Sequence, residues 1–266
     1  MTAAAPNRVK EALRAGRPSI GSWITLGHTS IAEIMAQAGF EWLVIDLEHS
    51  TVGIDGVLPL LQVIELSDSV PIVCMCGHDP RLIHRVMDAG AAGVIVPMVS
   101  RAAQARAIVD AVKYPPEGSR SVGFGRAQGY GPGFHAHFNG CNDRPLVIAQ
   151  VEHRSAVEDI EGIVAVPGLD ALLVSPYDLS ASYGHAGQFD HPDIRAAQAR
   201  VLAVAAAAGI PAGLHLVHPD PAELARFVAR GFRLAAYGVD SLFLGDPVGA
   251  AARDAARLGA APGPRG

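Results

Sequence analysis

Glu152 and Asp178 point most directly to chemistry, because each closely follows a short β-branched run that predicts a buried strand. If these two strands are neighbours in a parallel sheet, they lie roughly 4.8 Å apart and both carboxylates can reach one ion. Two carboxylates leave four positions of an octahedral Mg²⁺ or Mn²⁺ for water or a chelating substrate. The pattern therefore indicates a catalytic metal site. Two structural roles compete with it: an arginine partner for Glu152 and a helix N-cap for Asp178.

Asp46 and His49 form a D-x-x-H pattern where another predicted strand ends. An aspartate that accepts a hydrogen bond from one imidazole nitrogen raises the basicity of the other nitrogen, which makes His49 a candidate general base. The competing interpretation is an ordinary surface histidine, because the chain holds 11 histidines.

Lysine is nearly absent from the chain. Only Lys10 and Lys113 occur, one in a predicted N-terminal helix and the other at the far end of a predicted βα helix. A Schiff-base mechanism needs a buried amine at a strand end, so the sequence disfavours it. If this protein makes or breaks carbon–carbon bonds, a metal must stabilise the enolate.

Short β-branched runs alternate with Ala- and Leu-rich helical patterns along nearly the whole chain, which is typical of repeated βα units around a parallel sheet. The predicted strands are 19–26, 42–48, 71–76, 93–99, 146–152, 170–176, 211–217 and 234–240. The helices predicted after them are 30–38, 55–66, 80–89, 101–113, 155–166, 192–208, 220–230 and 241–258. Eight such units predict a closed (β/α)₈ TIM barrel, in which catalytic groups lie at the carboxyl ends of the strands.

The remaining segments fit a one-domain protein. Residues 1–258 are expected to form the barrel domain, with an extra helix around 7–15 that plugs or flanks it, and residues 259–266 to form a flexible tail. The Gly-rich stretch 114–145 is the one long interruption, and an irregular segment of that length is usually a functional loop or a disordered one.

Composition excludes several classes of partner. The chain carries 21 basic and 26 acidic residues, a net charge of -5, and no Lys/Arg run, so nucleic acid is not an expected partner. Three cysteines without zinc-like spacing favour a reducing cytoplasm over a disulfide-stapled secreted fold. No apolar stretch is long enough for a membrane span, so the sequence predicts a soluble cytoplasmic protein.

Several segments together resemble a known family. They are N-x-x-K-x-x-L-x-x-G-x-x-x-I-G-x-W, AGFEWLVIDLEHS, DAGAAGVIVPMV, YPPEGSRSVG, G-x-G-R-A-x-x-Y-G, AQVE, SPYDLSAS and YGVDSLFL. They are similar to the metal-dependent, class II pyruvate aldolases of the HpcH/HpaI family, from about Asn7 to Asp246. The resemblance implies a barrel of the phosphoenolpyruvate/pyruvate-binding type.

The resemblance also implies roles for individual residues. Glu152 and Asp178 correspond to the two carboxylates that bind the divalent ion. His49, oriented by Asp46, corresponds to the dyad that moves protons through a water on the metal, and Glu48 would support that site.

Further roles concern the substrate and the assembly. Ser175, Pro176 and Tyr177 match the turn whose backbone groups help to hold the carboxylate of a 2-oxo acid, with Ser175 where most relatives have Gly. Asp88 matches an acidic residue of the family's active-site region. The family typically forms hexamers, dimers of trimers, with an exchanged C-terminal helix, here about 241–258.

One position departs from the family pattern. Most relatives carry an arginine at the end of the third strand that contacts the substrate's oxygens, and this chain has Cys74 there. A donor to a developing oxyanion is commonly worth about 3 to 4 kcal/mol. Three explanations stay open: a different substrate, a replacement donor such as His78 or Arg126, or a decayed enzyme. Cys74 itself fits a small apolar filler better than a reactive thiol.

The expected function is a divalent-metal aldolase, using Mg²⁺, Mn²⁺ or Co²⁺, that acts through the enolate of a 2-oxo acid such as pyruvate. It would cleave or form 4-hydroxy-2-oxo acids with an aldehyde partner, as a trimer or hexamer. The alternatives are another condensation or lyase reaction on the same metal and enolate scaffold, and a barrel that binds a ligand without turnover.

Overall fold

Eight parallel strands pair in sequence order, and the eighth closes onto the first. The computed structural model describes residues 6–259. The strands are β1 (Ser19–Ile24), β2 (Trp42–Asp46), β3 (Val70–Cys74), β4 (Gly93–Val96), β5 (Leu146–Val151), β6 (Ala171–Val174), β7 (Ala212–Leu216) and β8 (Leu234–Val239). The predicted (β/α)₈ TIM barrel is confirmed, and every predicted strand is present with ends shifted by at most three residues.

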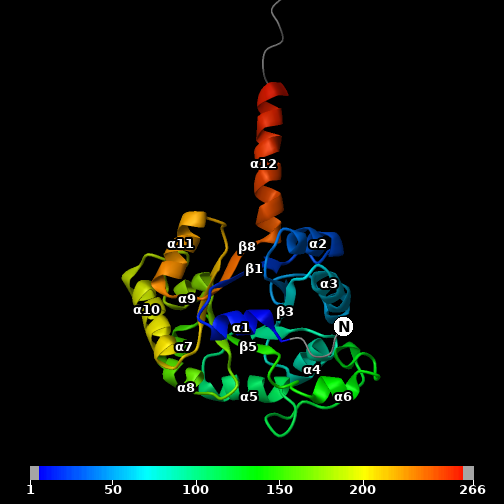
Figure 1. Ribbon diagram of the computed structural model, residues 1–266. Coiled ribbons are helices and arrows are strands. Elements are labelled where there is room, and N and C mark those ends of the chain that lie inside the picture. The colour runs from blue at the N-terminus through cyan, green and yellow to red at the C-terminus, as the bar shows by residue number, and fades with distance from the viewer. Residues whose placement is uncertain (1–5, 260–266) are drawn as a thin grey trace, which may run out of the picture.

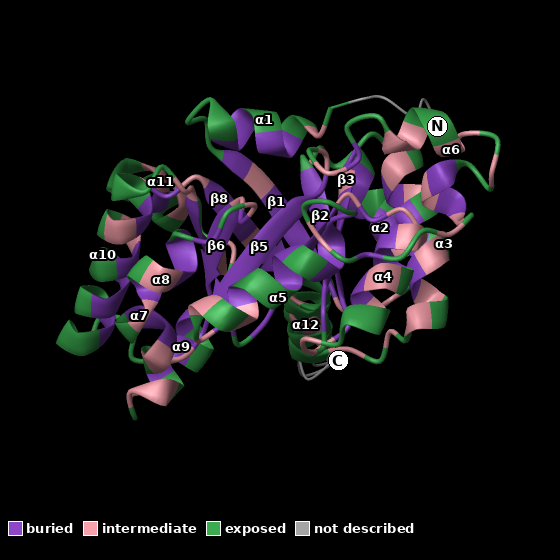
Figure 2. Ribbon diagram, turned by 90° about the horizontal axis from the view of Figure 1, so that it is seen from below, coloured by how far each residue is buried: buried purple, intermediate pink, exposed green. Residues whose placement is uncertain are grey.

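A ring of helices surrounds the strands (Figure 1). The helices are α1 (Arg8–Arg14), α2 (Thr29–Gln37), α3 (Ile54–Leu66), α4 (Pro80–Asp88), α5 (Ala102–Val112), η1 (Arg126–Gln128), α6 (Phe134–Phe138), α7 (Arg154–Glu158), α8 (Ile160–Val164), α9 (Pro176–Ser182), α10 (Pro192–Ala207), α11 (Pro221–Arg230) and α12 (Asp240–Gly259). Figure 2 shows buried strands at the centre and helices whose outer faces are exposed.

The strands are apolar on both faces because they pack against two different layers. One parity, which includes Trp42, Ile72 and Ile148, fills the inside of the barrel. The other parity, which includes Leu43 and Val73, packs against the helices. The two-residue period of a strand therefore decides which polar residues at the strand ends point inward.

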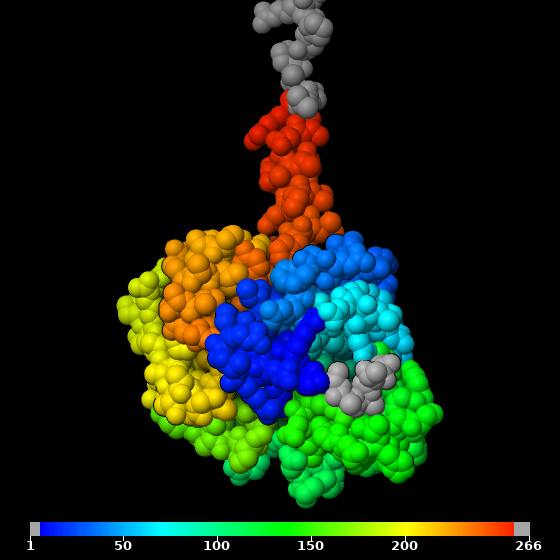
Figure 3. Space-filling view, in the orientation of Figure 1, coloured from blue at the N-terminus to red at the C-terminus, as the bar shows by residue number. Residues whose placement is uncertain are grey.

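Helix α1 closes the end of the barrel where the strands begin. Val9 and Leu13 belong to the interior apolar cluster, and the Nζ atom of Lys10 lies 2.8 Å from Pro145 O and 2.8 Å from Asp170 Oδ1. The helix occupies the middle of the face seen in Figure 3. This confirms the expected N-terminal helix and places it as a plug.

Two local predictions were wrong. The helix predicted over 155–166 is interrupted at Asp159, whose carboxylate accepts a hydrogen bond from the backbone N–H of Ala102 on α5 at 2.8 Å. Helix α9 was absent from the predicted helices and was implied only by the N-cap alternative for Asp178. It begins directly after β6, because Pro176 at its first position lacks an N–H for the sheet but suits the start of a helix.

The interruption at 114–145 is mostly irregular, as predicted, with η1 and the short α6 inside it. Its two ends are tied together. The backbone N–H of Tyr114 donates to Asn142 Oδ1 at 2.8 Å, and Asn142 Nδ2 donates back to Tyr114 O at 2.9 Å. Gln128 Nε2 donates to the Tyr114 hydroxyl at 2.8 Å. These contacts hold the segment at the end where the strands begin.

Helix α12 departs from the ring and projects outward as a rod (Figure 1). Leu244 and Val248 on this helix are 51% and 58% exposed. The predicted tail lies outside the described residues except for Gly259, which ends α12. Among the described helices, none combines the length and apolar character needed to cross a membrane.

Candidate active site

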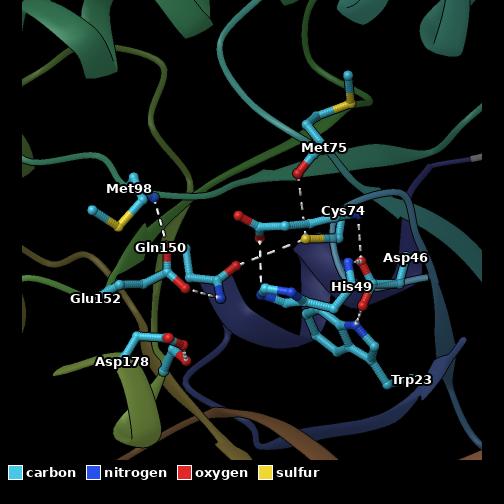
Figure 4. A network of polar contacts seen from close by, with 11 residues as sticks. Trp23, Asp46, His49, Cys74, Met75, Met98, Gln150, Glu152 and Asp178 are labelled. Atoms are coloured by element: carbon cyan, nitrogen blue, oxygen red, sulfur yellow. Dashed lines mark hydrogen bonds and ion pairs between the residues drawn. The ribbon is translucent and has the colours of Figure 1, made fainter. Parts of the chain in front are cut away.

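Strand parity brings a group of polar side chains together at the carboxyl end of the barrel. Each of three polar residues comes two positions after an inward-facing apolar residue of its strand, and therefore points inward as well. They are Asp46 after Val44, Cys74 after Ile72 and Gln150 after Ile148. Figure 4 shows these side chains, together with Glu152 and Asp178, facing one space. The sequence prediction that β2, β3, β5 and β6 contribute to one site therefore has a geometric basis.

Glu152 is held at both carboxylate oxygens. Its Oε2 accepts the backbone N–H of Met98 at 2.7 Å, and its Oε1 accepts Gln150 Nε2 at 2.7 Å. The side chain is buried, and its pKa is raised to about 7, chiefly by this burial; the Met98 N–H opposes the increase, and Glu48 and Asp178 contribute to it. Glu152 has no arginine partner among the described residues, so that structural role is not its role here.

Asp178 lies in the first turn of α9, near enough to Glu152 for its charge to raise the pKa of Glu152. Its Oδ2 accepts the hydroxyl of Ser175 at 2.6 Å. The N-cap residue of α9 is Ser175, not Asp178, so the N-cap alternative for Asp178 was wrong. Ser175 instead anchors the acidic side chain at the rim.

These acids fit a divalent cation. Burial raises the pKa of Glu48, and Asp46 and Asp178 add to the increase. No arginine or lysine of the described residues hydrogen-bonds or pairs with Asp46, Glu48, Glu152 or Asp178. Such a group of oxygen donors with uncompensated negative charge suits a hard cation such as Mg²⁺ or Mn²⁺. Glu152 and Asp178 are the residues that would hold it.

Asp46 does not orient the imidazole of His49 as the sequence suggested. Its Oδ1 accepts the backbone N–H groups of Glu48 at 2.8 Å and His49 at 3.0 Å, and its Oδ2 accepts Trp23 Nε1 at 2.9 Å. An aspartate at a strand end readily caps the backbone of the following turn, and the indole takes the remaining oxygen. The expected side-chain dyad is therefore corrected to an aspartate that shapes the turn carrying His49.

His49 lies nearest to a different carboxylate. Its Nε2 is 3.8 Å from Glu48 Oε2, and its side chain is 72% exposed. The imidazole of His49 lowers the pKa of Glu48 and so favours the charged form of that carboxylate. The pair Glu48 and His49 thus reaches the solvent side of the site, while Asp46 is buried beneath it.

Cys74 occupies the expected position beside the acids but is 1% exposed. Its Sγ lies 3.9 Å from Gln150 Oε1. Burial raises the pKa of the thiol well above its usual value, and Asp46, Glu48 and Glu152 raise it further. The side chain is therefore a protonated filler, in line with the prediction that it is not reactive.

Of the two proposed replacements for the missing arginine, His78 lies beside the site, next to the turn that binds Glu152. Its Nε2 lies 2.6 Å from the carbonyl oxygen of Pro97. The next residue, Met98, has φ of 53° and donates its N–H to Glu152. His78 therefore supports the turn that holds a candidate metal ligand, and its Nε2 is occupied by that backbone carbonyl.

Asp88 and Arg126 do not join the site of their own chain, so these two predictions were wrong for a single chain. Asp88 ends α4 and lies 2.5 Å from the buried Arg120. Arg126 pairs with Glu65 near the end of α3. Helices return toward the starts of the strands, so both residues lie at the opposite end of the barrel.

The sequence assigned no role to three residues of the site. Trp23 holds Asp46 and stacks on His215 with ring centroids 4.7 Å apart. Burial lowers the pKa of His215 to about 4, so the ring is neutral near pH 7. Inward parity in β1 and β7 is the signal that could have identified Trp23 and His215, and the AQVE segment already contained the third, Gln150.

Known proteins share this chain's sequence and fold. The family model described as HpcH/HpaI aldolase/citrate lyase matches residues 19–247. A 4-hydroxy-2-oxovalerate aldolase of Novosphingobium aromaticivorans is 40% identical over 236 residues, 88% of this chain and 89% of that protein. A 4-hydroxy-2-oxo-heptane-1,7-dioate aldolase of Salmonella dublin is 38% identical over 240 residues, 90% of each.

Solved structures agree with the sequence comparisons. The crystal structure of an HpcH/HpaI aldolase/citrate lyase family protein from Burkholderia cenocepacia matches with a TM-score of 0.88 and 34% identity, over 94% of this chain and 99% of that one. The resemblance seen in the sequence motifs is thereby confirmed: the chain belongs to the HpcH/HpaI aldolase/citrate lyase family.

Proposed function

We propose that this protein is a divalent-metal-dependent aldolase that cleaves or forms 4-hydroxy-2-oxo acids through the enolate of pyruvate or a similar 2-oxo acid. The carrying observation is the group of carboxylates at the carboxyl end of the barrel, which contains the buried Asp46 and Glu152 and has no arginine or lysine partner among the described residues. The aldolase names of the curated relatives favour this function over a barrel that binds without turnover.

The positions of the two lysines support metal-assisted over Schiff-base chemistry. Lys10 is bound to Asp170 and Pro145 at the plugged end of the barrel. Lys113 follows α5 and its Nζ lies 2.9 Å from Glu117. Both amines lie at the end opposite the acids, so neither can attack a carbonyl bound there.

Each residue of the site has a definable task. Glu152, fixed by Met98 and Gln150, and Asp178, fixed by Ser175, would hold Mg²⁺ or Mn²⁺ with oxygen ligands. The bound cation supplies positive charge that stabilises a developing enolate. Because the ligands are already oriented by hydrogen bonds, little reorganisation is needed when the cation binds.

Glu48 and His49 would move the proton of the aldol hydroxyl. His49 is exposed at the rim, and the carboxylate of Glu48 lies 3.8 Å from its Nε2. An imidazole that gains and loses a proton near neutral pH suits a general base in cleavage and a general acid in condensation. Asp46 would position this pair through the backbone of the turn.

The turn between β6 and α9 would bind the carboxylate of the 2-oxo acid. Pro176 has no N–H, so the donors available there are the backbone N–H groups of Tyr177 and Asp178 in the first turn of α9. Tyr177 is 42% exposed and borders the opening of the site. The Ser175 hydroxyl already binds Asp178, so it serves the acid and not the substrate.

The active form would be a homo-oligomer, a trimer or hexamer, in which α12 packs against another copy. The support is α12 itself, which leaves the barrel and keeps Leu244 and Val248 exposed. An apolar stripe on a projecting helix is stabilised when a second surface covers it.

The proposal is tested by exchange of the pyruvate methyl protons in D₂O, followed by NMR. We expect exchange with Mn²⁺ or Mg²⁺, none with EDTA, and a large loss in Glu152→Gln and Asp178→Asn. Glu158→Gln is the matched control, because Glu158 is an exposed residue of α7 just after the same strand. Absence of metal-dependent exchange with several 2-oxo acids, in a protein that binds Mn²⁺, would contradict the enolate mechanism.

A further inference from the structure

A second cluster of metal-binding side chains lies on the same rim but outside the acidic site. His185, His191 and Asp193 come from the segment that joins α9 to α10 and from the first turn of α10. One ligand atom of each lies within 4.8 Å of the other two. We call these three residues the His–His–Asp cluster.

The three side chains converge without bonding directly to one another. His185 Nε2 and His191 Nδ1 each lie 3.7 Å from the same atom, Asp193 Oδ2. These separations exceed a hydrogen bond but approach the spacing of about 3.3 Å between ligand atoms on a tetrahedral Zn²⁺. No arginine or lysine of the described residues pairs with Asp193, and the nearby Arg195 pairs with Asp190 at 2.9 Å.

The backbone holds the cluster in place. The N–H of His185 donates to Ser180 O at 2.9 Å, and the N–H of His191 donates to Gln188 O at 3.0 Å. His191 Nδ1 accepts the N–H of Asp193 at 3.3 Å, so its lone pair already points toward the first turn of α10. Metal binding at this nitrogen would replace that hydrogen bond.

Besides the loss of the hydrogen bond from the Asp193 N–H to His191, two smaller features oppose a cation. The imidazole rings stack with centroids 3.5 Å apart, so one ring must turn before both lone pairs point at one ion; this torsion of histidine is soft. The N-terminus of α10 carries positive dipole charge, which the Asp193 carboxylate offsets.

From this geometry we propose that His185, His191 and Asp193 bind one Zn²⁺, with a fourth position left to water. Two imidazoles and one carboxylate suit Zn²⁺ or Co²⁺, whereas Mg²⁺ prefers oxygen ligands only. The cluster and the acidic site therefore select different ions, and this proposal does not depend on the catalytic one.

The ion would fasten a segment that borders the active site. Phe189, between the two histidines, packs edge-on against Tyr177 with centroids 4.7 Å apart. Tyr177 adjoins the candidate ligand Asp178. Zn²⁺ at the cluster would thus stabilise this wall of the opening by linking the start of α10 to the segment before it.

The test is Zn²⁺ titration by calorimetry, and Co²⁺ titration by absorption, of the Glu152→Gln/Asp178→Asn variant. We expect one Zn²⁺ to remain bound and Co²⁺ to give tetrahedral d–d bands. Adding His185→Gln or Asp193→Asn should weaken binding by more than about tenfold, since even outer partners of metal ligands contribute that much. Neither change removes the His191 imidazole that caps α10, and melting curves check the fold.

His28→Gln/His135→Gln in the same background is the matched control, because both histidines are exposed and belong to other segments. Unchanged Zn²⁺ binding is expected there. If the starting variant folds poorly, the wild type saturated with Mg²⁺ is titrated instead, since Mg²⁺ blocks only the oxygen-ligand site. The proposal is overturned if no Zn²⁺ binds, or if His185→Gln leaves the affinity unchanged.

Discussion

At the scale of single residues, the negative charge of the site is concentrated on groups that cannot all ionise easily without a cation. Glu48 and Glu152 both have raised pKa values, chiefly because they are buried. Cys74 adds no compensating charge, since its thiol stays protonated. We therefore expect this site to depend on a bound cation more strongly than a site with an arginine in place of Cys74.

The raised pKa of Glu152 predicts a pH-dependent metal affinity. With a pKa of about 7, Glu152 binds a proton below neutral pH, and the metal must displace that proton. Mn²⁺ affinity should fall roughly tenfold per pH unit below about pH 7 and level off above it. Calorimetry at about pH 6 and about pH 8, in buffers of different ionisation enthalpy, measures both affinity and proton release.

Without metal, the same shift acts on stability in the opposite direction. The pKa of Glu152 is higher in the folded protein than the ordinary value of 4.5 for a glutamate, so the folded state binds more protons between about pH 4.5 and pH 7. The contribution of Glu152 to the free energy of unfolding should fall as pH rises through this window. In the calorimetric test described above, equal Mn²⁺ affinity at about pH 6 and about pH 8 would contradict the assignment of Glu152 as a ligand.

Sequence could identify the acids but not their partners. Glu152 and Asp178 follow strands whose order was readable, so their proximity followed from parallel pairing. Asp46 does not bind the imidazole of His49, because its carboxylate oxygens accept the indole N–H of Trp23 and two backbone N–H groups instead. Such competition involves groups that are distant in sequence, and no spacing encodes it.

At the scale of elements, α1 is fastened to the barrel by a buried ion pair. Lys10 is 4% exposed, and burial lowers its pKa although Asp170 raises it in part. Asp170 also accepts the backbone N–H of Val147 at 3.0 Å, which links the helix to the start of β5. The pair thus connects the plug to two strands of the sheet.

Lys10→Met should destabilise the protein by about 3 kcal/mol or more, because it leaves Asp170 buried without its partner. Urea denaturation measures the change. Arg8→Met is the matched control: the Arg8–Asp68 pair is 42% and 95% exposed, and such pairs contribute at most about 1 kcal/mol. Equal losses in the two variants would show that the buried pair does not fasten the helix.

Helices and strands were predictable where their hydrophobic periodicity is regular. They were not predictable where a contact with a distant residue interrupts the element. The alternation of buried strands and amphipathic helices was sufficient for the barrel, including the helix at its N-terminal end. The break at Asp159 was not, because it depends on the contact with Ala102. Asp88 and Arg126 lie in segments that match family motifs. Asp88 ends α4 and Arg126 belongs to the 114–145 segment, so both lie at the end of the barrel opposite the site.

At the scale of the whole molecule, the ring of helices is incomplete in a single chain. The eighth helix of a TIM barrel ordinarily packs beside the first strand, and here α12 extends outward (Figure 1). Its Leu244 and Val248 are exposed, and so is Ile34 on α2, at 64%. An exchange of α12 between copies would bury the exposed residues of the helix on a neighbouring barrel.

Leu244→Asp/Val248→Asp should therefore dissociate the oligomer. Burying one such side chain is worth about 1.5–3 kcal/mol. Each α12 that packs on a neighbouring barrel would bury both substituted residues, so the two new charges should shift assembly strongly toward monomer. Sedimentation velocity measures the mass. Leu66→Asp is the control, since Leu66 is 86% exposed at the end of α3 and should tolerate a charge. If the double variant keeps the wild-type mass while Leu66→Asp also does, α12 lies outside the interface, and the projecting helix needs another partner.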